Sequence, residues 1–196
     1  MKEKKIYFPS SSWNLESDPV HFYAYCNKAF SKKECSKIID IANKKGLIQG
    51  TTYGKKDARK SQISWLYPVD DMKWVFQRVT DLALDINKKY FKFDIFGLNE
   101  GFQFTNYKAP SDKYKKHVDR AHNRPVRKLS ITIQLTDPKK YEGGEFLLYD
   151  DHPGTIMDRD QGKLIIFPSY VLHEVKPVTK GERNSLVCWV TGKPFV

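Results

Sequence analysis

The sequence is poor in cysteine and has no long apolar run. Its three cysteines, Cys26, Cys35 and Cys188, are odd in number and include no Cys-x-x-Cys pair, which argues against a secreted disulfide framework and indicates a reducing compartment. No apolar run approaches the roughly 20 residues that cross a bilayer, and no apolar signal core follows the charged start of the chain. We therefore expect a soluble cytoplasmic protein with no membrane partner.

Acidic residues are fewer than basic ones: 34 lysines and arginines stand against 23 aspartates and glutamates, a net charge of +11. This excess fits nucleic acid, a membrane surface or an acidic protein as partner. The lysines are scattered as pairs rather than massed in one tract, which favours a solvated surface. A chain of 196 residues with no Pro/Ser-rich linker is expected to form one domain over residues 1–196.

The first half of the chain, residues 1–99, has helical patterns. Ser31 and Glu34 form a capping box that opens a helix, and Gly46 is its natural stop. A second helix is expected with Asp70 or Asp71 as its cap. Its apolar residues recur at the three-and-four spacing of one buried face: Met72, Val75, Phe76, Val79, Leu82, Ala83 and Ile86.

The second half, residues 100–196, has β patterns separated by turn residues. Alternation is clear from Leu129 to Leu135, where every second residue is apolar. Strands are predicted here at 102–107, 128–135, 145–149, 163–167 and 185–191, and one more is predicted in the first half at 62–67. Short strands at this spacing favour a sandwich, jelly roll or barrel. The fold class is therefore mainly β with α, with helices packed outside a C-terminal barrel.

Only five histidines are present, and two of them lie in informative places. In extended backbone, His117 and Asp119 point to the same face, and His173 lies where a barrel could return it beside them. Two imidazoles and one carboxylate form the facial triad of non-haem Fe(II) oxygenases. Arg183, ten residues after His173, offers a fork for a carboxylate, and Ser185 faces the same way. His122 and His152 fall in expected loops, and His21 has no evident partner.

The stretch from about residue 102 to 189 resembles the Fe(II)- and 2-oxoglutarate-dependent dioxygenases, and within them the prolyl 4-hydroxylase-like group that includes bacterial and phage hydroxylases. The matching motifs occur in the family's order: Tyr107, Tyr114, His117-Val118-Asp119, Arg127-Lys128-Leu129-Ser130, Gln134-Leu135, Gly143-Gly144-Glu145, Phe167-Pro168-Ser169, Leu172-His173-Glu174-Val175, Gly181 and Arg183. The resemblance implies a double-stranded β-helix, a jelly roll supported by N-terminal helices.

The resemblance also implies residue roles. His117, Asp119 and His173 would ligate Fe(II), and Arg183 would pair with the C5 carboxylate of 2-oxoglutarate. Tyr107 matches a position whose phenol contacts this co-substrate, with a barrel-core tyrosine as the other interpretation. The remaining candidates for the co-substrate pocket are Ser185, Gln134 and Trp189.

The implied reaction is hydroxylation of a C–H bond with oxidative decarboxylation of 2-oxoglutarate to succinate, using Fe(II) and O2; ascorbate is left open as a further cofactor. The most favoured reaction is 4-hydroxylation of prolyl residues in a protein or peptide, by an intracellular enzyme of a bacterium or phage. Because the site must exclude water, loops at 51–60 and 108–116 are predicted as lids.

Three alternatives remain open. An oxidative demethylase of nucleic acid would suit the positive charge, but that group has a second arginine six residues after the first, and Trp189 stands there. A free amino acid or other small molecule is a second possible substrate. A catalytically inactive jelly-roll binding module is the third, although such a module has no reason to retain His117, Asp119, His173 and Arg183 together.

Overall fold

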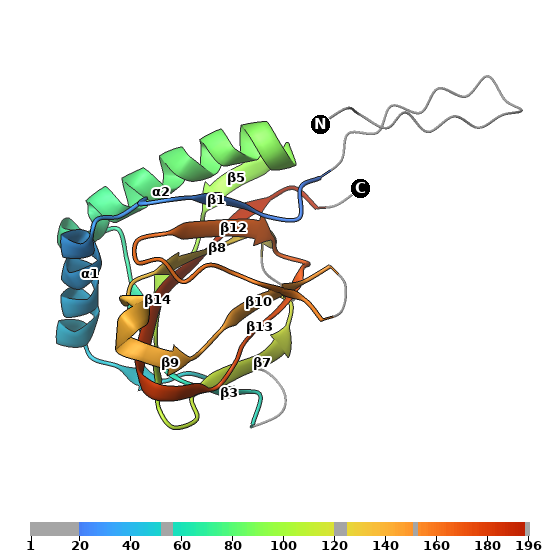
Figure 1. Cartoon of the computed structure of the whole chain (residues 1–196). Helices are drawn as coiled ribbons and strands as arrows, with labels where there is room; N and C mark the ends of the chain where they lie inside the picture. Colours follow the sequence, from blue (N-terminus) through green and yellow to red (C-terminus); the bar gives the residue numbers. More distant parts are fainter. Residues whose placement is uncertain (1–19, 52–56, 120–124, 151–152, 195–196) are drawn as a thin grey trace, which may run out of the picture.

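The computed structural model describes residues 20–51, 57–119, 125–150 and 153–194. Two antiparallel sheets lie face to face, with the two main helices on the outside of the larger one (Figure 1). The larger sheet has the order β1 (Ala24–Cys26), β12 (Leu164–Pro168), β8 (Val126–Gln134), β14 (Val178–Gly192), β6 (Phe102–Lys108), β4 (Gln62–Leu66) and β2 (Ile48–Gln49), with β5 (Ile95–Leu98) and β9 (Tyr141–Gly143) also paired to β14.

The smaller sheet closes the other side of the barrel. Its order is β11 (Thr155–Ile156), β10 (Phe146–Tyr149), β13 (Leu172–Val175), β7 (Lys113–His117) and β3 (Arg59–Lys60). Strands from the two halves of the sequence therefore share both sheets, and the predicted jelly roll is confirmed.

The larger sheet separates two apolar cores. In β8, Leu129, Ile131 and Ile133 face the helices, whereas Ser130 and Thr132 face the barrel interior. The helix-side core is continuous with apolar residues of both helices. The barrel-side core is smaller and contains Tyr107, Phe146, Leu148, Met157, Ile165, Phe167, Val171, Val175 and Val178. The polar side chains of the barrel interior are thus surrounded by these apolar side chains.

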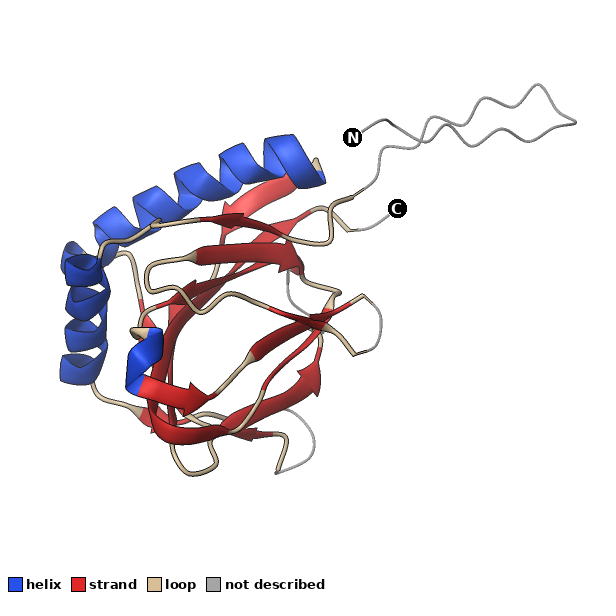
Figure 2. Cartoon of the chain, in the orientation of Figure 1, coloured by secondary structure: helices blue, strands red, loops and turns tan. Residues whose placement is uncertain are grey.

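The helices are α1 (Lys32–Lys45) and α2 (Lys73–Ile86), flanked by a 3-10 turn η1 (Asp70–Met72), a π-helical turn η2 (Asn87–Phe91) and a distant 3-10 turn η3 (Pro138–Lys140). Figure 2 shows both main helices on one side of the strands. The predicted capping box is present: Glu34 N–H donates to Ser31 Oγ at 3.3 Å, and Ser31 N–H donates to Glu34 Oε2 at 2.8 Å. Gly46 follows the helix with φ of 96°.

The start of α2 differs from the prediction. The expected cap at Asp70 or Asp71 is wrong, because η1 precedes the helix and the N-cap position falls at Met72, with no side-chain cap. The predicted buried face is nevertheless present, apart from Leu82, which is only partly buried. The apolar spacing therefore predicted this helix correctly, whereas the residue types at its start did not predict its N-cap.

The predicted strands correspond to β4, β6, β8, β10, β12 and β14, with boundaries that shift by a few residues and a β14 that starts much earlier. The other strands, which are all short, were not predicted from sequence: β1, β2, β3, β5, β7, β9, β11 and β13. No helix within the described ranges has the length and apolarity needed to span a membrane.

Candidate metal centre and its surroundings

His117 and His173 are brought together by the smaller sheet. His117 ends β7 and pairs in register with His173 on β13, and their ring centroids are 4.1 Å apart. Asp119 follows β7, and its backbone N–H donates to the Ser169 carbonyl at 3.0 Å. The barrel thus returns His173 to the His-x-Asp segment, as the sequence predicted.

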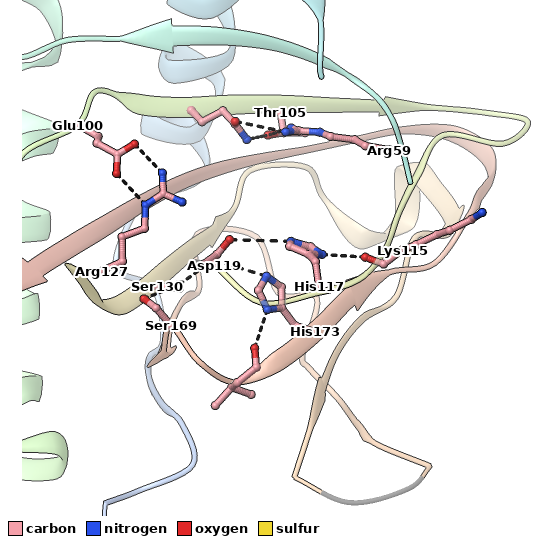
Figure 3. A network of polar contacts seen from close by, with 12 residues as sticks. Arg59, Glu100, Thr105, Lys115, His117, Asp119, Arg127, Ser130, Ser169 and His173 are labelled. Atoms are coloured by element: carbon pink, nitrogen blue, oxygen red, sulfur yellow. Dashed lines mark hydrogen bonds and ion pairs between the residues drawn. The ribbon is translucent and has the colours of Figure 1, made fainter. Parts of the chain in front are cut away.

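The donor atoms of the three side chains converge on one point (Figure 3). One donor atom from each lies within 4.8 Å of the others. Asp119 Oδ1 is 3.9 Å from His117 Nε2, and Asp119 Oδ2 is 3.5 Å from His173 Nε2. This is the only such group of three metal-ligating side chains among the residues that the structure describes.

Backbone carbonyls fix the tautomer of each imidazole. His117 Nδ1 lies 2.7 Å from the Lys115 carbonyl oxygen, and His173 Nδ1 lies 2.9 Å from that of Val171. A carbonyl only accepts, so Nδ1 carries the proton and donates. The Nε2 lone pairs are therefore directed toward Asp119 and are available for a cation.

The charge states suit a metal ion. Burial, followed by the neighbouring His173 ring, lowers the pKa of His117 to about 4, so the His117 imidazole is neutral at pH 7. Burial alone would raise the pKa of Asp119, but the two histidine rings and the Ser130 hydroxyl hold it below its usual value. A neutral nitrogen and an ionised carboxylate are the forms that coordinate metals. Two nitrogens and one oxygen fit a non-haem Fe(II) site with open positions.

A buried arginine lies deeper in the barrel. Arg183 is 2% exposed; its Nη2 donates to Gln134 Oε1 at 2.9 Å and its Nη1 to Ser185 Oγ at 3.4 Å. Its guanidinium carbon lies 5.6 Å from the centre of the Tyr107 ring. The structure thus brings these four predicted residues together. Within the described ranges, no carboxylate forms an ion pair with Arg183, and such a buried cation favours an anionic ligand.

Trp189 lies at the metal end of the interior rather than beside Arg183. Trp189 is the sixth residue after Arg183 in β14, which is about 20 Å along an extended strand. The Trp189 ring packs 6.2 Å from that of Trp65, and the Arg127 guanidinium carbon lies 3.7 Å from its centre. The indole helps to lower the pKa of Asp119, although its N–H has no hydrogen bond of normal geometry within the described part of the chain.

Sequence reasoning missed Arg59. This residue was expected in a flexible loop, but it lies in β3 and is 9% exposed. Its Nε donates to Ser61 Oγ at 2.7 Å, and its guanidinium carbon is 5.0 Å from the Tyr114 ring centre. Its positive charge contributes to the lowered pKa of His117. Nothing in the sequence distinguishes this arginine from the exposed basic residues around it.

The two segments predicted as lid loops contain strands. In segment 108–116, residues 113–116 are not a loop, because β7 pairs with both β13 and β3. In segment 51–60, residues 52–56 lie outside the described residues, and Arg59–Lys60 forms a strand. His122 and His152 also lie outside the described residues. His21 is exposed and packs against Tyr90, with ring centroids 5.2 Å apart, away from the triad.

Residues 102–191 match the sequence model of the 2OG-Fe(II) oxygenase superfamily. A PKHD-type hydroxylase of Alteromonas mediterranea is 38% identical over 94 residues, which are 44% of this chain and 41% of that relative. The chain therefore spans less than half the length of this curated relative. The matched region contains the triad, Arg183 and the four other predicted pocket residues.

Solved structures share the fold. A Pseudomonas putida prolyl-4-hydroxylase has a TM-score of 0.73 and 21% identity, covering 89% of this chain and 94% of that chain. A prolyl hydroxylase from Trichoplax adhaerens, in complex with a hypoxia inducible factor oxygen degradation domain peptide fragment, has a TM-score of 0.74 and 18% identity, covering 87% of this chain and 84% of that chain. At these identities, the likeness shows the jelly-roll fold.

Proposed function

We propose, from the match of residues 102–191 to the model of the 2OG-Fe(II) oxygenase superfamily, that the chain is a dioxygenase of this superfamily that hydroxylates prolyl residues of a protein or peptide. The observation that carries the proposal is the convergence of His117, Asp119 and His173 in the same barrel interior that holds the buried Arg183.

The three convergent side chains would hold Fe(II) through two Nε2 atoms and a carboxylate oxygen. Bound Fe(II) would activate O2, the oxidant, with 2-oxoglutarate as the two-electron reductant: one oxygen atom would be inserted into the substrate C–H bond and the other would enter succinate, with loss of carbon dioxide. Backbone carbonyls orient the two imidazoles, and the apolar barrel wall excludes water from the reacting atoms.

Arg183 would bind the far carboxylate of 2-oxoglutarate. Its guanidinium has neutral hydrogen-bond partners, Gln134 and Ser185, so its charge is not neutralised before the co-substrate enters. A guanidinium can form two parallel hydrogen bonds to one carboxylate. The Tyr107 ring packs against the Arg183 guanidinium. Its phenol O–H would be a further hydrogen-bond donor to 2-oxoglutarate.

Two features support a peptide as substrate. The paired rings of Trp65 and Trp189 give an aromatic surface beside Asp119, which suits an apolar pyrrolidine ring. Arg59 adds a buried guanidinium on the strand next to His117, where it can donate to a backbone carbonyl. The solved complex of the Trichoplax adhaerens enzyme with a peptide is consistent with this substrate class.

The test is incubation of the purified protein with Fe(II), 2-oxoglutarate and a panel of proline-containing peptides, followed by mass spectrometry. One added oxygen on proline is the expected result, and Asp119→Ala is the inactive control. Methylated single-stranded DNA and free amino acids are run in parallel. Oxidation of DNA or of a free amino acid alone would overturn the prolyl substrate, and an absence of succinate from every mixture would overturn the oxygenase itself.

A further inference from the structure

The Asp119 carboxylate is held by a side chain to which the proposed reaction gives no role. Ser130 Oγ lies 2.7 Å from Asp119 Oδ2 and 3.0 Å from Ser169 Oγ. Ser130 is 1% exposed and Ser169 is 2% exposed. Ser130 comes from β8 of the larger sheet and Ser169 from the turn that leads from β12 to β13, so two separate segments contribute to the position of one carboxylate.

The direction of these hydrogen bonds follows from their chemistry. An ionised carboxylate only accepts, and a hydroxyl has a single proton. Ser130 therefore donates to Asp119, and Ser169 donates to Ser130. The backbone also contributes, because the Asp119 N–H donates to the Ser169 carbonyl. Ser169 thus fixes Asp119 twice, through its main chain and through the Ser130 hydroxyl.

We infer that Ser130 is a positioning residue that keeps Asp119 monodentate toward the metal. The inference rests on the proposed Fe(II) site. Hydrogen bonding ties up one lone pair of Oδ2, while Oδ1 has no hydrogen bond of normal geometry from the described residues. A metal held by one carboxylate oxygen and two Nε2 atoms would keep open positions for other ligands. Two of these suit a chelating 2-oxoglutarate, and one suits O2.

Without the hydroxyl, the carboxylate is free to rotate and present both oxygens to the metal. The second oxygen then competes with the co-substrate for a coordination position. Loss of Ser130 should therefore weaken two steps: metal binding, by the roughly 10- to 100-fold typical of outer-shell changes, and the subsequent binding of 2-oxoglutarate. A residue that only filled space in the barrel wall would alter stability without changing the coordination of the metal.

Co(II) is a suitable probe, because its visible absorption reports coordination number and geometry. The protein is titrated with Co(II) and then with 2-oxoglutarate, as wild type, Ser130→Ala, Ser130→Thr and Ser169→Ala. Thr132→Val is the matched control, because Thr132 is also buried, lies on the same strand and faces the same interior. Thermal melting of the metal-free proteins establishes that each variant folds.

Ser130→Ala is expected to change the Co(II) spectrum, weaken Co(II) binding at least 10-fold and require more 2-oxoglutarate for its spectral change. Ser130→Thr should restore wild-type behaviour, Ser169→Ala should have a smaller effect, and Thr132→Val should have none. Wild-type Co(II) and co-substrate binding by Ser130→Ala would overturn the inference; if that variant does not fold, an unchanged Ser169→Ala would do so. A wild-type protein that binds no Co(II) contradicts the proposed metal site instead.

Discussion

His117 and His173 stand opposite each other on neighbouring antiparallel strands, with their ring centroids 4.1 Å apart and both Nδ1 atoms bonded to backbone carbonyls. This pairing fixes two nitrogen ligands before any metal arrives. The conformational entropy of the two histidine side chains is therefore lost during folding rather than on metal binding. The free energy of metal binding can then stabilise the folded barrel.

Replacement of His173 by alanine should abolish metal-dependent turnover. One of three ligands is lost, so Fe(II) affinity should fall by more than the roughly 10- to 100-fold of an outer-shell change. Succinate formation from 2-oxoglutarate in the absence of a peptide, together with a metal titration, measures the effect. His21→Ala is the control, because His21 is exposed and packs only at the edge of Tyr90. Unchanged turnover in His173→Ala would refute the metal assignment.

Replacement of Arg183 should act on the co-substrate. A charge-assisted hydrogen bond contributes about 1.5–3 kcal/mol, so Arg183→Ala should raise the KM for 2-oxoglutarate roughly 10- to 100-fold. Arg183→Lys retains the charge without the fork and should fall between wild type and alanine. Initial rates at varied 2-oxoglutarate give the KM. A normal KM with a collapsed melting temperature would instead make Arg183 a structural residue.

The sequence predicted the metal triad from the local His117-x-Asp119 spacing together with the order of the downstream motifs. His117 and Asp119 are two residues apart, whereas His173 lies in β13, shortly after the strongly apolar β12, and reaches them through the pairing of β13 with β7. The capping box of α1 and the alternation of β8 were equally readable, since each depends on residues within one turn or one strand. The role of the triad in binding iron stays a prediction that the experiments above test.

Other features depend on contacts that sequence patterns do not contain. The strand β7 has mainly polar residues, so its sequence resembled a loop, and its place is set by pairing with β13 and β3. Arg59 is buried by the same pairing. The cap of α2 was misplaced because a 3-10 turn takes up the first residues after the loop. Tertiary pairing, rather than local propensity, decided the first two.

Gly144→Ala should lower the stability of the fold and also weaken the binding of 2-oxoglutarate. Gly144 has φ of 65°, and an added Cβ would lie 2.9 Å from Val178 Cγ2 and 3.1 Å from Arg183 Cδ. The left-handed backbone costs about 1–2 kcal/mol for an alanine, and the contact displaces the Arg183 side chain. We expect lower stability in urea and a higher KM for 2-oxoglutarate.

Gly46→Ala is the matched control for this substitution. Gly46 also has a positive φ, 96°, but no atom lies within 4 Å of its added Cβ. Its variant should lose stability and retain the wild-type KM. An equal rise of KM in both variants would show that general destabilisation, rather than pressure on Arg183, causes the effect.

Glu34→Gln should lower stability at neutral pH and lose its effect in acid. The hydrogen bond and ion pair with Arg78, at 2.9 Å, and the Ser31 backbone N–H lower the pKa of Glu34 from 4.5 to about 2. Since the folded-state pKa is lower, the ionised form stabilises the fold fully above pH 4.5, and this contribution disappears as pH falls from 4.5 toward 2. Because the pair is partly solvated, a loss of about 1 kcal/mol is expected at pH 7.

Urea unfolding of wild type and Glu34→Gln at intervals between pH 3 and pH 7 measures this difference. The two curves of unfolding free energy should converge as pH falls below 4.5, because protonation removes from wild type the charge that the variant already lacks. Glu142→Gln is the control: its pair with Lys180 is exposed, so its effect should stay below about 0.5 kcal/mol at every pH. A gap between wild type and Glu34→Gln that persists undiminished at pH 3 would mean that the shape of the capping side chain, and not its charge, stabilises the start of α1.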